Sequence, residues 1–534
     1  MKRKMYVVAL CLLILLFSGC SGRKQEVRMD EAAASLTENS PDDKYRTSYE
    51  IFVYSFCDSN GDGIGDLKGI EEKLDYIGET MGFDQIWTTP VFPSPTYHKY
   101  DATDYMAIDP QFGTMEDFDR LLAACHEKGI RWILDLAVNH TSVEHPWFQQ
   151  AAAYLRELPP DWEPSVEYCP YFDYYHFSRE YQNGYAALEG TNWYYEARFW
   201  EGMPDLNLDS EAVRAELTDI FRFWLDKGVD GFRLDALTSY YTDDIDASIG
   251  FTRWLTETVR SIDPDAYLVG EVWADQSIYS RYYASGIDSL FDFRFAGDSG
   301  VITQMAKGSR SAAKLAEDLR SEEELYRSIN PQAVNAPFYT NHDMARGAGY
   351  YGYDKGGRTK LALGLNLMMT GNVFTYYGEE VGMKGSGKDE NKRAPMYWSA
   401  DAAAEGMCSG PPDLDSFDQK FDSVQAQLED PDSILNYCRA AIRIRKAFPV
   451  IARGATVPQE GWLSETICAF TREGEGMEPV LVFINTAEEA QTVDLKESPY
   501  KQIAGVLASA SDKAVLKGTK LTVPALGIVI LRQK

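Results

Sequence analysis

Short apolar segments alternate with amphipathic segments along most of the chain. Segments of strand character, rich in Val, Ile, Phe, Tyr and Trp, occupy residues 49–56, 83–90, 131–140, 229–236, 266–273, 289–295 and 372–378. Between several of them, apolar residues recur at helical spacing, which predicts helices over 116–128, 211–227 and 433–446. Strands that alternate with helices indicate a parallel sheet. Seven or eight such units in about 400 residues predict an α/β fold, a closed (β/α)8 TIM barrel.

Two regions interrupt this rhythm. Residues 141–204 are rich in Tyr, Trp, Phe and Pro and lack a clear βα unit, so we interpret them as a domain inserted after the third strand, domain B. Beyond Pro449 the pattern becomes short alternating strands separated by turns, which predicts a C-terminal antiparallel β-sandwich over 453–534. The barrel then comprises residues 46–140 and 205–448.

The N-terminal end has a separate character. Lys2, Arg3 and Lys4 precede an apolar segment from residue 5 to residue 17. A segment of this length is too short to span a bilayer core of about 30 Å, and it is typical of a signal peptide, here residues 1–19. Residues 20–45 are polar and small without apolar periodicity, which predicts a flexible tether.

Composition and charge narrow the function. The 534 residues are 45% hydrophobic and 25% charged, which is ordinary for a globular protein. The formal net charge of -30 argues against nucleic-acid binding, which needs clustered Lys and Arg, and is compatible with a neutral ligand. Eight cysteines without a C-x-x-C pair indicate neither a disulfide scaffold nor a zinc ribbon.

Polar residues follow several of the predicted barrel strands. Because catalytic groups of a parallel barrel lie at the C-terminal ends of its strands, these positions are candidates for an active site. Any one of them alone is explained by a helix cap, a salt bridge or a turn, but carboxylates at four strand ends together indicate chemistry. They are Asp135 with Asn139 and His140, Arg233 with Asp235, Glu271, and Asn341 with His342 and Asp343.

These segments resemble a known family. DLAVNH (135–140), GFRLDA (231–236), GEVW (270–273) and NHD (341–343) are similar to the four ordered regions of the α-amylase superfamily, glycoside hydrolase family 13. MPDLN (203–207) resembles a fifth region. The resemblance extends over about residues 48–450 and implies a retaining glycosidase, acting on starch-type glucans, on a barrel with a C-terminal β-domain.

The resemblance also implies residue roles. Asp235 would be the nucleophile, Glu271 the general acid and base, and Asp343 the stabiliser of the distorted sugar, in agreement with the two carboxyls that double displacement needs. Arg233 lies two residues before Asp235 in a strand, so both point to one face. A satisfied core histidine is the alternative for each histidine. The implied substrate-binding residues are Tyr100, His140, Arg233, His342, His98 and Arg346.

A glycine-rich loop is a candidate metal site. Residues 58–63 begin like an EF-hand loop, D-x-N-x-D-G, although Gly69 stands at the twelfth position, where that loop requires Glu. The segment DSNGDGIGDLKGI resembles the calcium loop after the first strand of oligo-1,6-glucosidase-like relatives. This implies Ca²⁺, with a metal-free Asx turn as the alternative. The implied ligands are Asp58, Asn60, Asp62, Ile64 and Asp66.

Residues 17–20, Phe-Ser-Gly-Cys, resemble a bacterial lipobox. The resemblance implies cleavage before Cys20 and acylation of its thiol, so that the enzyme is secreted and held by a lipid anchor on the outer face of a bacterial cell membrane. A plain cleavage site followed by an incidental cysteine is the alternative.

Shorter motifs indicate which glucosidic bond the enzyme prefers. MPDLN lies between the QPDLN of oligo-1,6-glucosidase-like enzymes and the MPKLN of neopullulanase-like enzymes. YHKYD (97–101) and residues 376–396 also resemble this intermediate group, in which α-amylases are common. Ala236 after the nucleophile is similar to α-amylases, whereas a bulkier Val there is associated with α-1,6 preference. Many α-amylases have Lys-His where this chain has Thr238 and Ser239, which leaves open the usual interdomain calcium, for which Asn139 is present. We therefore expect an α-amylase acting on α-1,4 bonds of starch or maltodextrin.

Several alternatives stay open. Within the family they are an α-glucosidase or oligo-1,6-glucosidase, a neopullulanase-like enzyme and a 4-α-glucanotransferase. A non-catalytic glucan-binding lipoprotein would typically lose one of the three carboxylates, and this chain retains Asp235, Glu271 and Asp343.

Overall fold

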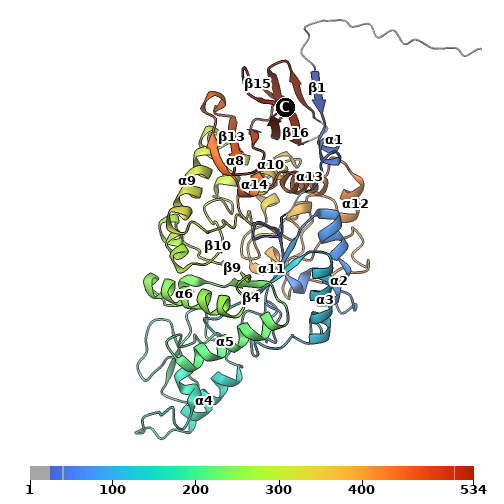
Figure 1. Cartoon of the computed structure of the whole chain (residues 1–534). Coiled ribbons are helices and arrows are strands. Elements are labelled where there is room, and N and C mark those ends of the chain that lie inside the picture. Colours follow the sequence, from blue (N-terminus) through green and yellow to red (C-terminus); the bar gives the residue numbers. More distant parts are fainter. Residues whose placement is uncertain (1–23, 39–40, 510–511, 534) are drawn as a thin grey trace, which may run out of the picture.

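The computed structural model describes residues 24–38, 41–509 and 512–533. The predicted signal peptide and Cys20 lie outside these ranges. At the centre is a parallel sheet with the strand order β10-β9-β8-β4-β3-β2-β11 (Figure 1). Its strands are β2 (Thr47–Ile51), β3 (Gln85–Thr88), β4 (Arg131–Leu136), β8 (Gly231–Leu234), β9 (Tyr267–Gly270), β10 (Ser289–Leu290) and β11 (Val373–Tyr376).

The sheet closes through an eighth extended segment. Ala336 forms a parallel bridge with Phe291, next to β10, and Phe338 forms one with Phe374 of β11. Residues 336–338 therefore take the eighth place, and the predicted barrel is confirmed. Large side chains fill its interior, as the fold requires: Trp87, Ile133, Tyr267, Val269, Phe291, Phe338 and Phe374.

Helices surround the barrel, and their start signals are visible in the sequence. Thr114 and Asp117 form a reciprocal capping box at the start of α3, while Ser210 and Ser433 cap α5 and α13. The three predicted helices are confirmed to within two residues. The main barrel helices are α2 (Leu67–Glu72), α3 (Met115–Glu127), α5 (Glu211–Asp226), α6 (Ile245–Ile262), α8 (Val301–Lys307), α9 (Ala313–Ile329), α10 (Gly357–Leu367) and α13 (Ile434–Ala447).

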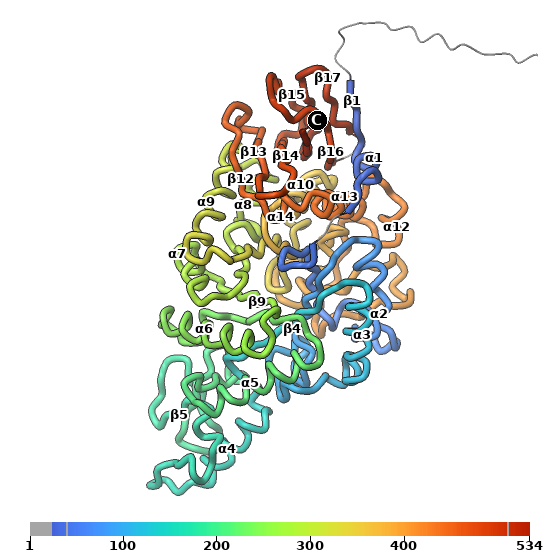
Figure 2. Tube along the Cα trace, viewed as in Figure 1, coloured from blue at the N-terminus to red at the C-terminus, as the bar shows by residue number. Residues whose placement is uncertain are grey.

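Domain B leaves the barrel after β4 and returns before α5. It holds α4 (Pro146–Glu157) and a small antiparallel sheet of β5 (Phe177–Ser178), β7 (Tyr194–Glu196) and β6 (Tyr185–Ala187). An antiparallel bridge between His140 and Asp205 joins the outgoing and returning chains. Domain B and α4 lie at the end of the molecule opposite the C-terminal strands (Figure 2).

The C-terminal region is an antiparallel β-sandwich, as predicted. One sheet has the order β12-β13-β14-β19-β16 and the other β1-β17-β18-β15. Apolar side chains such as Phe483, Val506 and Leu521 are buried together in this region. Its strands are β12 (Ala455–Pro458), β13 (Ile467–Glu473), β14 (Val480–Asn485), β15 (Gln491–Asp494), β16 (Tyr500–Leu507), β17 (Ala514–Lys517), β18 (Lys520–Val523) and β19 (Gly527–Gln533).

The prediction of a flexible tether over residues 20–45 is wrong for the part that the structure describes. Strand β1 (Lys24–Val27) pairs antiparallel with β17, and helix α1 (Met29–Ala34) follows it. Met29 and Ala32 are buried. The edge of the C-terminal sheet supplies backbone hydrogen bonds that a four-residue segment cannot make alone, so tertiary pairing overrides the polar composition.

Two further findings concern the described residues only. No helix among them has the length and apolar character needed to cross a membrane. Their six cysteines are buried and carry free thiols.

Candidate active site

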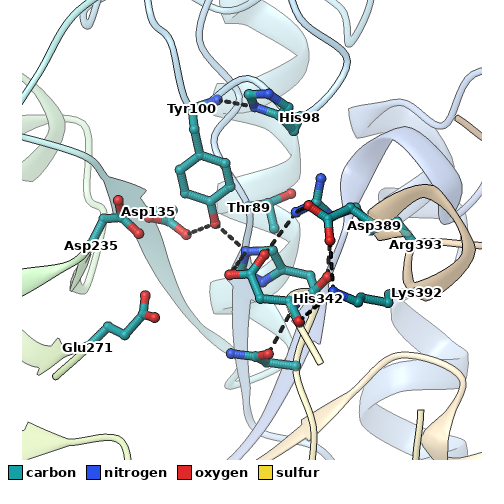
Figure 3. Close-up of polar contacts among 12 residues, drawn as sticks. Thr89, His98, Tyr100, Asp135, Asp235, Glu271, His342, Asp389, Lys392 and Arg393 are labelled. Atoms are coloured by element: carbon teal, nitrogen blue, oxygen red, sulfur yellow. Dashed lines mark hydrogen bonds and ion pairs between the residues drawn. The ribbon is translucent and has the colours of Figure 1, made fainter. Parts of the chain in front are cut away.

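The three candidate catalytic carboxylates lie at one end of the barrel. Asp235 directly follows β8 and Glu271 directly follows β9, which are neighbouring strands. Asp343 lies in the loop after the eighth extended segment. Asp235 and Glu271 lie on one side of Tyr100, and Arg393 lies on the other (Figure 3).

One guanidinium group connects the carboxylates of the neighbouring strands. Arg233 is fully buried, and its Nη1 donates to Asp235 at 2.5 Å and to Asp135 at 2.9 Å. Its Nη2 donates to Glu271. Because both ends of the same planar fork are used, Asp235 and Glu271 must lie within a few ångströms of each other. Arg233 thus positions the carboxylates, and its implied role in binding substrate is wrong, because its side chain has no exposed surface.

Burial and partners separate the protonation of these groups. Burial raises the pKa of Glu271 to about 8, against the opposing attraction of Arg233. For Asp343, burial favours the neutral form, but the cationic Arg393 and Arg233, with His342 beside the carboxyl group, outweigh it and lower the pKa to about 2. At neutral pH the site therefore holds a proton on Glu271 and a negative charge on Asp343.

Tyr100 is the centre of a buried polar chain. Its hydroxyl donates to Asp135 at 2.9 Å and lies 2.8 Å from His342 Nε2, and its ring stacks on that histidine. His342 Nδ1 in turn lies 2.7 Å from a carboxylate oxygen of Glu50. His140 contacts the carbonyl of Tyr100 at 2.9 Å, and His98 accepts from its backbone N–H at 3.2 Å.

The histidines are neutral in this setting. Burial lowers the pKa of His342 to about 3 and that of His98 to about 4, and it also lowers the pKa of His140. Neutral imidazoles can accept or donate hydrogen bonds to sugar hydroxyls without adding charge to the site.

The implied substrate-binding role of Arg346 is wrong. Its side chain has no exposed surface, and it donates to the carbonyl oxygens of Tyr377 and Lys392. The guanidinium carbon also lies 4.3 Å from the ring centre of Tyr376. Arg346 therefore supports the backbone behind the site and cannot reach a sugar.

Arg393 was missed as a site residue. It donates to Asp343 at 2.8 Å and to the hydroxyl of Tyr97 at 2.8 Å. It belongs to the segment 376–396, whose sequence resembles the intermediate group within the family but indicates no role for this arginine. A cation two residues before a proline gives no pattern of its own, so only the fold reveals its contact with Asp343.

Exposed aromatic rings near the carboxylates were also missed. Trp273, two residues after Glu271, is 54% exposed and stacks on Phe293 with ring centres 4.9 Å apart. Phe199 of domain B lies 5.2 Å from the ring of His140. Exposed aromatic faces suit the apolar faces of sugar rings. The Trp in GEVW was a signal for this, since a large apolar residue at a strand end has no core to fill.

The candidate calcium loop is held by its own side chains. Asp58 accepts from the backbone N–H groups of Asn60, Gly61 and Gly63. Asn60 and Asp62 each accept from the residue two positions later, and Asp66 accepts from Ser59 and Gly69. Within the described residues, no three His, Cys, Asp or Glu side chains gather in a metal-binding arrangement. The donor set, including the Asn60 amide and the Ile64 carbonyl, consists of oxygens, which suits a hard cation.

A polar pocket lies between domain B and the barrel. Asn139 and Asp205 line a cavity of about 190 Å³ together with Ser239 and Tyr240. Both polar side-chain atoms of Asn139 and one oxygen of Asp205 are buried without a hydrogen-bond partner among the described residues. Burial raises the pKa of Asp205 to about 7. This arrangement fits an occupant that supplies positive charge or hydrogen bonds.

Comparisons with known proteins agree with this geometry. Residues 50–454 match the family described as "Alpha amylase, catalytic domain". The chain is 38% identical to Alpha-amylase 3 of Dictyoglomus thermophilum over 422 residues, which cover 78% of this chain and 80% of that protein. It is 30% identical to Oligo-1,6-glucosidase of Heyndrickxia coagulans, with 86% and 94% covered. The solved structure of Eubacterium rectale Amy13B aligns with a TM-score of 0.93 and 45% identity over 96% of this chain and 99% of that one.

Proposed function

Because the chain belongs to the α-amylase family of glycoside hydrolases, we propose that it cleaves α-1,4-glucosidic bonds by double displacement at Asp235 and Glu271. The protein is a glycosidase, and its substrates are α-glucans such as starch and maltooligosaccharides. The observation that carries the residue assignment is the single Arg233 guanidinium that holds both carboxyls. Retaining glycosidases need carboxyls about 5–5.5 Å apart, closer than inverting ones.

In the first step, a carboxylate oxygen of Asp235 attacks the anomeric carbon. The glycosidic C–O bond breaks as the new C–O bond forms, and Glu271 passes its proton to the leaving oxygen. Arg233 donates to Asp235 and holds its carboxyl group in place, while the ionised Asp343 favours the positive charge that develops on the sugar. The product is a β-glucosyl ester and a shortened glucan.

In the second step, the ionised Glu271 removes a proton from water. The hydroxide oxygen attacks the same carbon, the ester bond to Asp235 breaks, and both carboxyls return to their initial state. Two inversions leave the α-configuration. Proton NMR of the first turnovers on maltooligosaccharides should therefore show the α-anomer, and a β-anomer product would rule out this scheme.

The α-1,4 preference is supported by Ala236 after Asp235 and by greater identity to an α-amylase than to an oligo-1,6-glucosidase. Time courses on amylose, maltotriose, pullulan and isomaltose test it. We expect cleavage of amylose and maltotriose with little release of glucose from isomaltose. Rapid cleavage of isomaltose would instead favour the oligo-1,6-glucosidase alternative, and longer products from maltotriose a glucanotransferase.

The loop 58–66 is proposed to hold one Ca²⁺ through Asp58, Asn60, Asp62, Asp66 and the carbonyl of Ile64. The ion would supply positive charge to a cluster of carboxylates, and its role would be structural. The catalytic residues act without it in the steps above.

The enzyme is also proposed to be lipid-anchored at Cys20 on the outer face of a bacterial cell membrane. The lipobox-like sequence before Cys20 supports this. In the native host, Cys20→Ser should move activity from the membrane fraction to the medium. Activity that stays with the membrane would show that something other than the lipid retains the enzyme.

A further inference from the structure

Three exposed lysines lie side by side at one end of the sheet that contains β1. Lys24 of β1 is opposite Lys517 of β17, and Lys517 is opposite Lys520 of β18. We call them the lysine row. Like charges directly opposite each other weaken a sheet, so sheet stability does not account for the row. It is also unusual in a chain with a formal net charge of -30.

Few acidic groups face the row. Glu26 forms ion pairs with Lys24 and, at 3.8 Å, with Lys513. Asp494 of β15 is opposite Lys520. Lys517, in the middle, has no ion pair among the described residues. The row therefore keeps positive charge available to an anionic surface.

The row also lies close to the proposed anchor. Only three residues separate Lys24 from Cys20, and the four residue steps between them span at most about 14 Å in a fully extended chain. One of them, Arg23, is also basic. Strand β1 is fixed to the sandwich, since Gln25 accepts from the backbone N–H of Ile503 at 3.0 Å and α1 buries Met29. A lipid on Cys20 would hold the lysine row against the headgroups.

We propose that the lysine row binds anionic lipid headgroups, so that the C-terminal sandwich lies on the membrane and the barrel lies beyond it. This inference rests on the proposed lipid anchor. Domain B, which borders the active site, lies at the opposite end of the molecule from β1 (Figures 1 and 2). The substrate-binding face is therefore turned away from the membrane at a fixed height, unlike an enzyme on a flexible tether.

The contribution of the row can be measured without the lipid. Soluble Cys20→Ser protein should bind vesicles containing phosphatidylglycerol more tightly than vesicles of phosphatidylcholine. Each lysine near an anionic surface contributes about a fivefold change in binding. The triple variant Lys24→Glu, Lys517→Glu and Lys520→Glu should therefore lose about 100-fold in affinity. The matched control makes the same charge change at three exposed lysines elsewhere: Lys68→Glu, Lys314→Glu and Lys355→Glu. Equal losses in both triple variants would overturn the proposal.

Orientation is tested with the lipidated full chain on the same vesicles. A single cysteine is introduced at exposed Thr519, between two lysines of the row, or at exposed Asp161 in domain B. The described native cysteines are buried, so the new thiol takes the fluorescent label. Energy transfer to a headgroup acceptor should be strong from position 519 and weak from position 161, and equal transfer would overturn the proposal. Protein that fails to float with the vesicles would contradict the anchor instead, and the soluble experiment would still decide the role of the row.

Discussion

At the scale of single residues, two carboxyl groups of the same site, Glu271 and Asp343, have opposite protonation states. Glu271 is buried beside one arginine that it shares with Asp235. Asp343 lies 3.2 Å from His342 and forms an ion pair with Arg393 at 2.8 Å. The competition between burial and positive neighbours therefore produces one acid and one anion from the same functional group.

Removal of the acid and removal of the nucleophile should be distinguishable. We expect Glu271→Gln to lower kcat on maltooligosaccharides by about 10²–10⁴-fold, the usual contribution of a general acid. Its loss on 4-nitrophenyl maltoside should be much smaller, because nitrophenolate leaves without a proton. Asp235→Asn should abolish turnover of both substrates, since no ester can form. Near-normal turnover by purified Asp235→Asn would contradict its assignment as nucleophile.

The pH profile should report the protonated state of the acid. Glu271 must carry a proton to act, and its pKa is raised to about 8, so kcat/KM on maltooligosaccharides should be maintained at neutral pH and fall as the pH rises through about 8. Full activity well above pH 9, measured on enzyme shown to remain folded, would contradict this role.

Sequence alone was sufficient for some site residues and insufficient for others. Asp235 and Glu271 could be predicted because each directly follows an apolar strand of a barrel, where position along the chain fixes position in space. Arg346 and Arg393 could not be distinguished in this way. Both lie in long connecting segments after barrel strands. Only tertiary packing places Arg346 against the backbone carbonyls of Tyr377 and Lys392, and Arg393 beside Asp343.

At the scale of elements, the 58–66 loop joins distant parts of the chain. Asp58 forms an antiparallel bridge with Gly406, and the N–H of Ser409 donates to the carbonyl of Gly63 at 2.8 Å. The loop thus fixes a long irregular segment against the first barrel strand. A cation in the loop would stabilise both.

Calcium removal should lower the melting temperature more than it lowers activity. At a hundredfold excess over Kd, one bound ion stabilises the fold by about 2.7 kcal/mol. Asp62→Ala should remove the bound metal, measured by mass spectrometry, and lower Tm by several degrees. Asp401→Ala is the matched control, because Asp401 makes the same kind of turn, to the N–H of Ala403, outside the loop. An unchanged Tm in Asp62→Ala, together with no metal in the parent protein, would contradict the calcium site and favour a metal-free Asx turn.

Long helices could be located from the sequence, whereas a short strand could not. Helices α3, α5 and α13 each have several turns of apolar periodicity and a Thr or Ser cap, so the sequence located them closely. Strand β1 has four residues with two partly buried positions, and its partner is nearly 500 residues away. No local signal could identify it, because the pairing energy comes from β17.

At the scale of the whole molecule, the negative net charge has no direct role in binding the substrate. The net charge of -30 creates a long-range field, but a neutral glucan has no charge on which that field can act. The net charge therefore affects solubility and the approach of the protein to other charged surfaces. The lysine row is a local region of positive charge on this negatively charged molecule.

Catalysis should accordingly be insensitive to salt. Between ~20 and ~200 mM ionic strength the Debye length falls severalfold, yet kcat/KM on maltooligosaccharides should change by less than about twofold. Binding of the soluble protein to anionic vesicles should weaken strongly over the same range. A steep salt dependence of kcat/KM would show that a charged group on the substrate or in the binding step had been overlooked.

The pairing of β1 with β17 would also set the order of events in the export that the proposed lipid anchor requires. Lys24 would leave the translocation channel among the first residues, but its partner Lys517 would leave among the last. The four-stranded sheet could close only after almost the whole chain had crossed, and the long loop between the partners would make that closure late and slow. Strand β1 would therefore still be unpaired while Cys20 was being processed, and it would join the sandwich only afterwards.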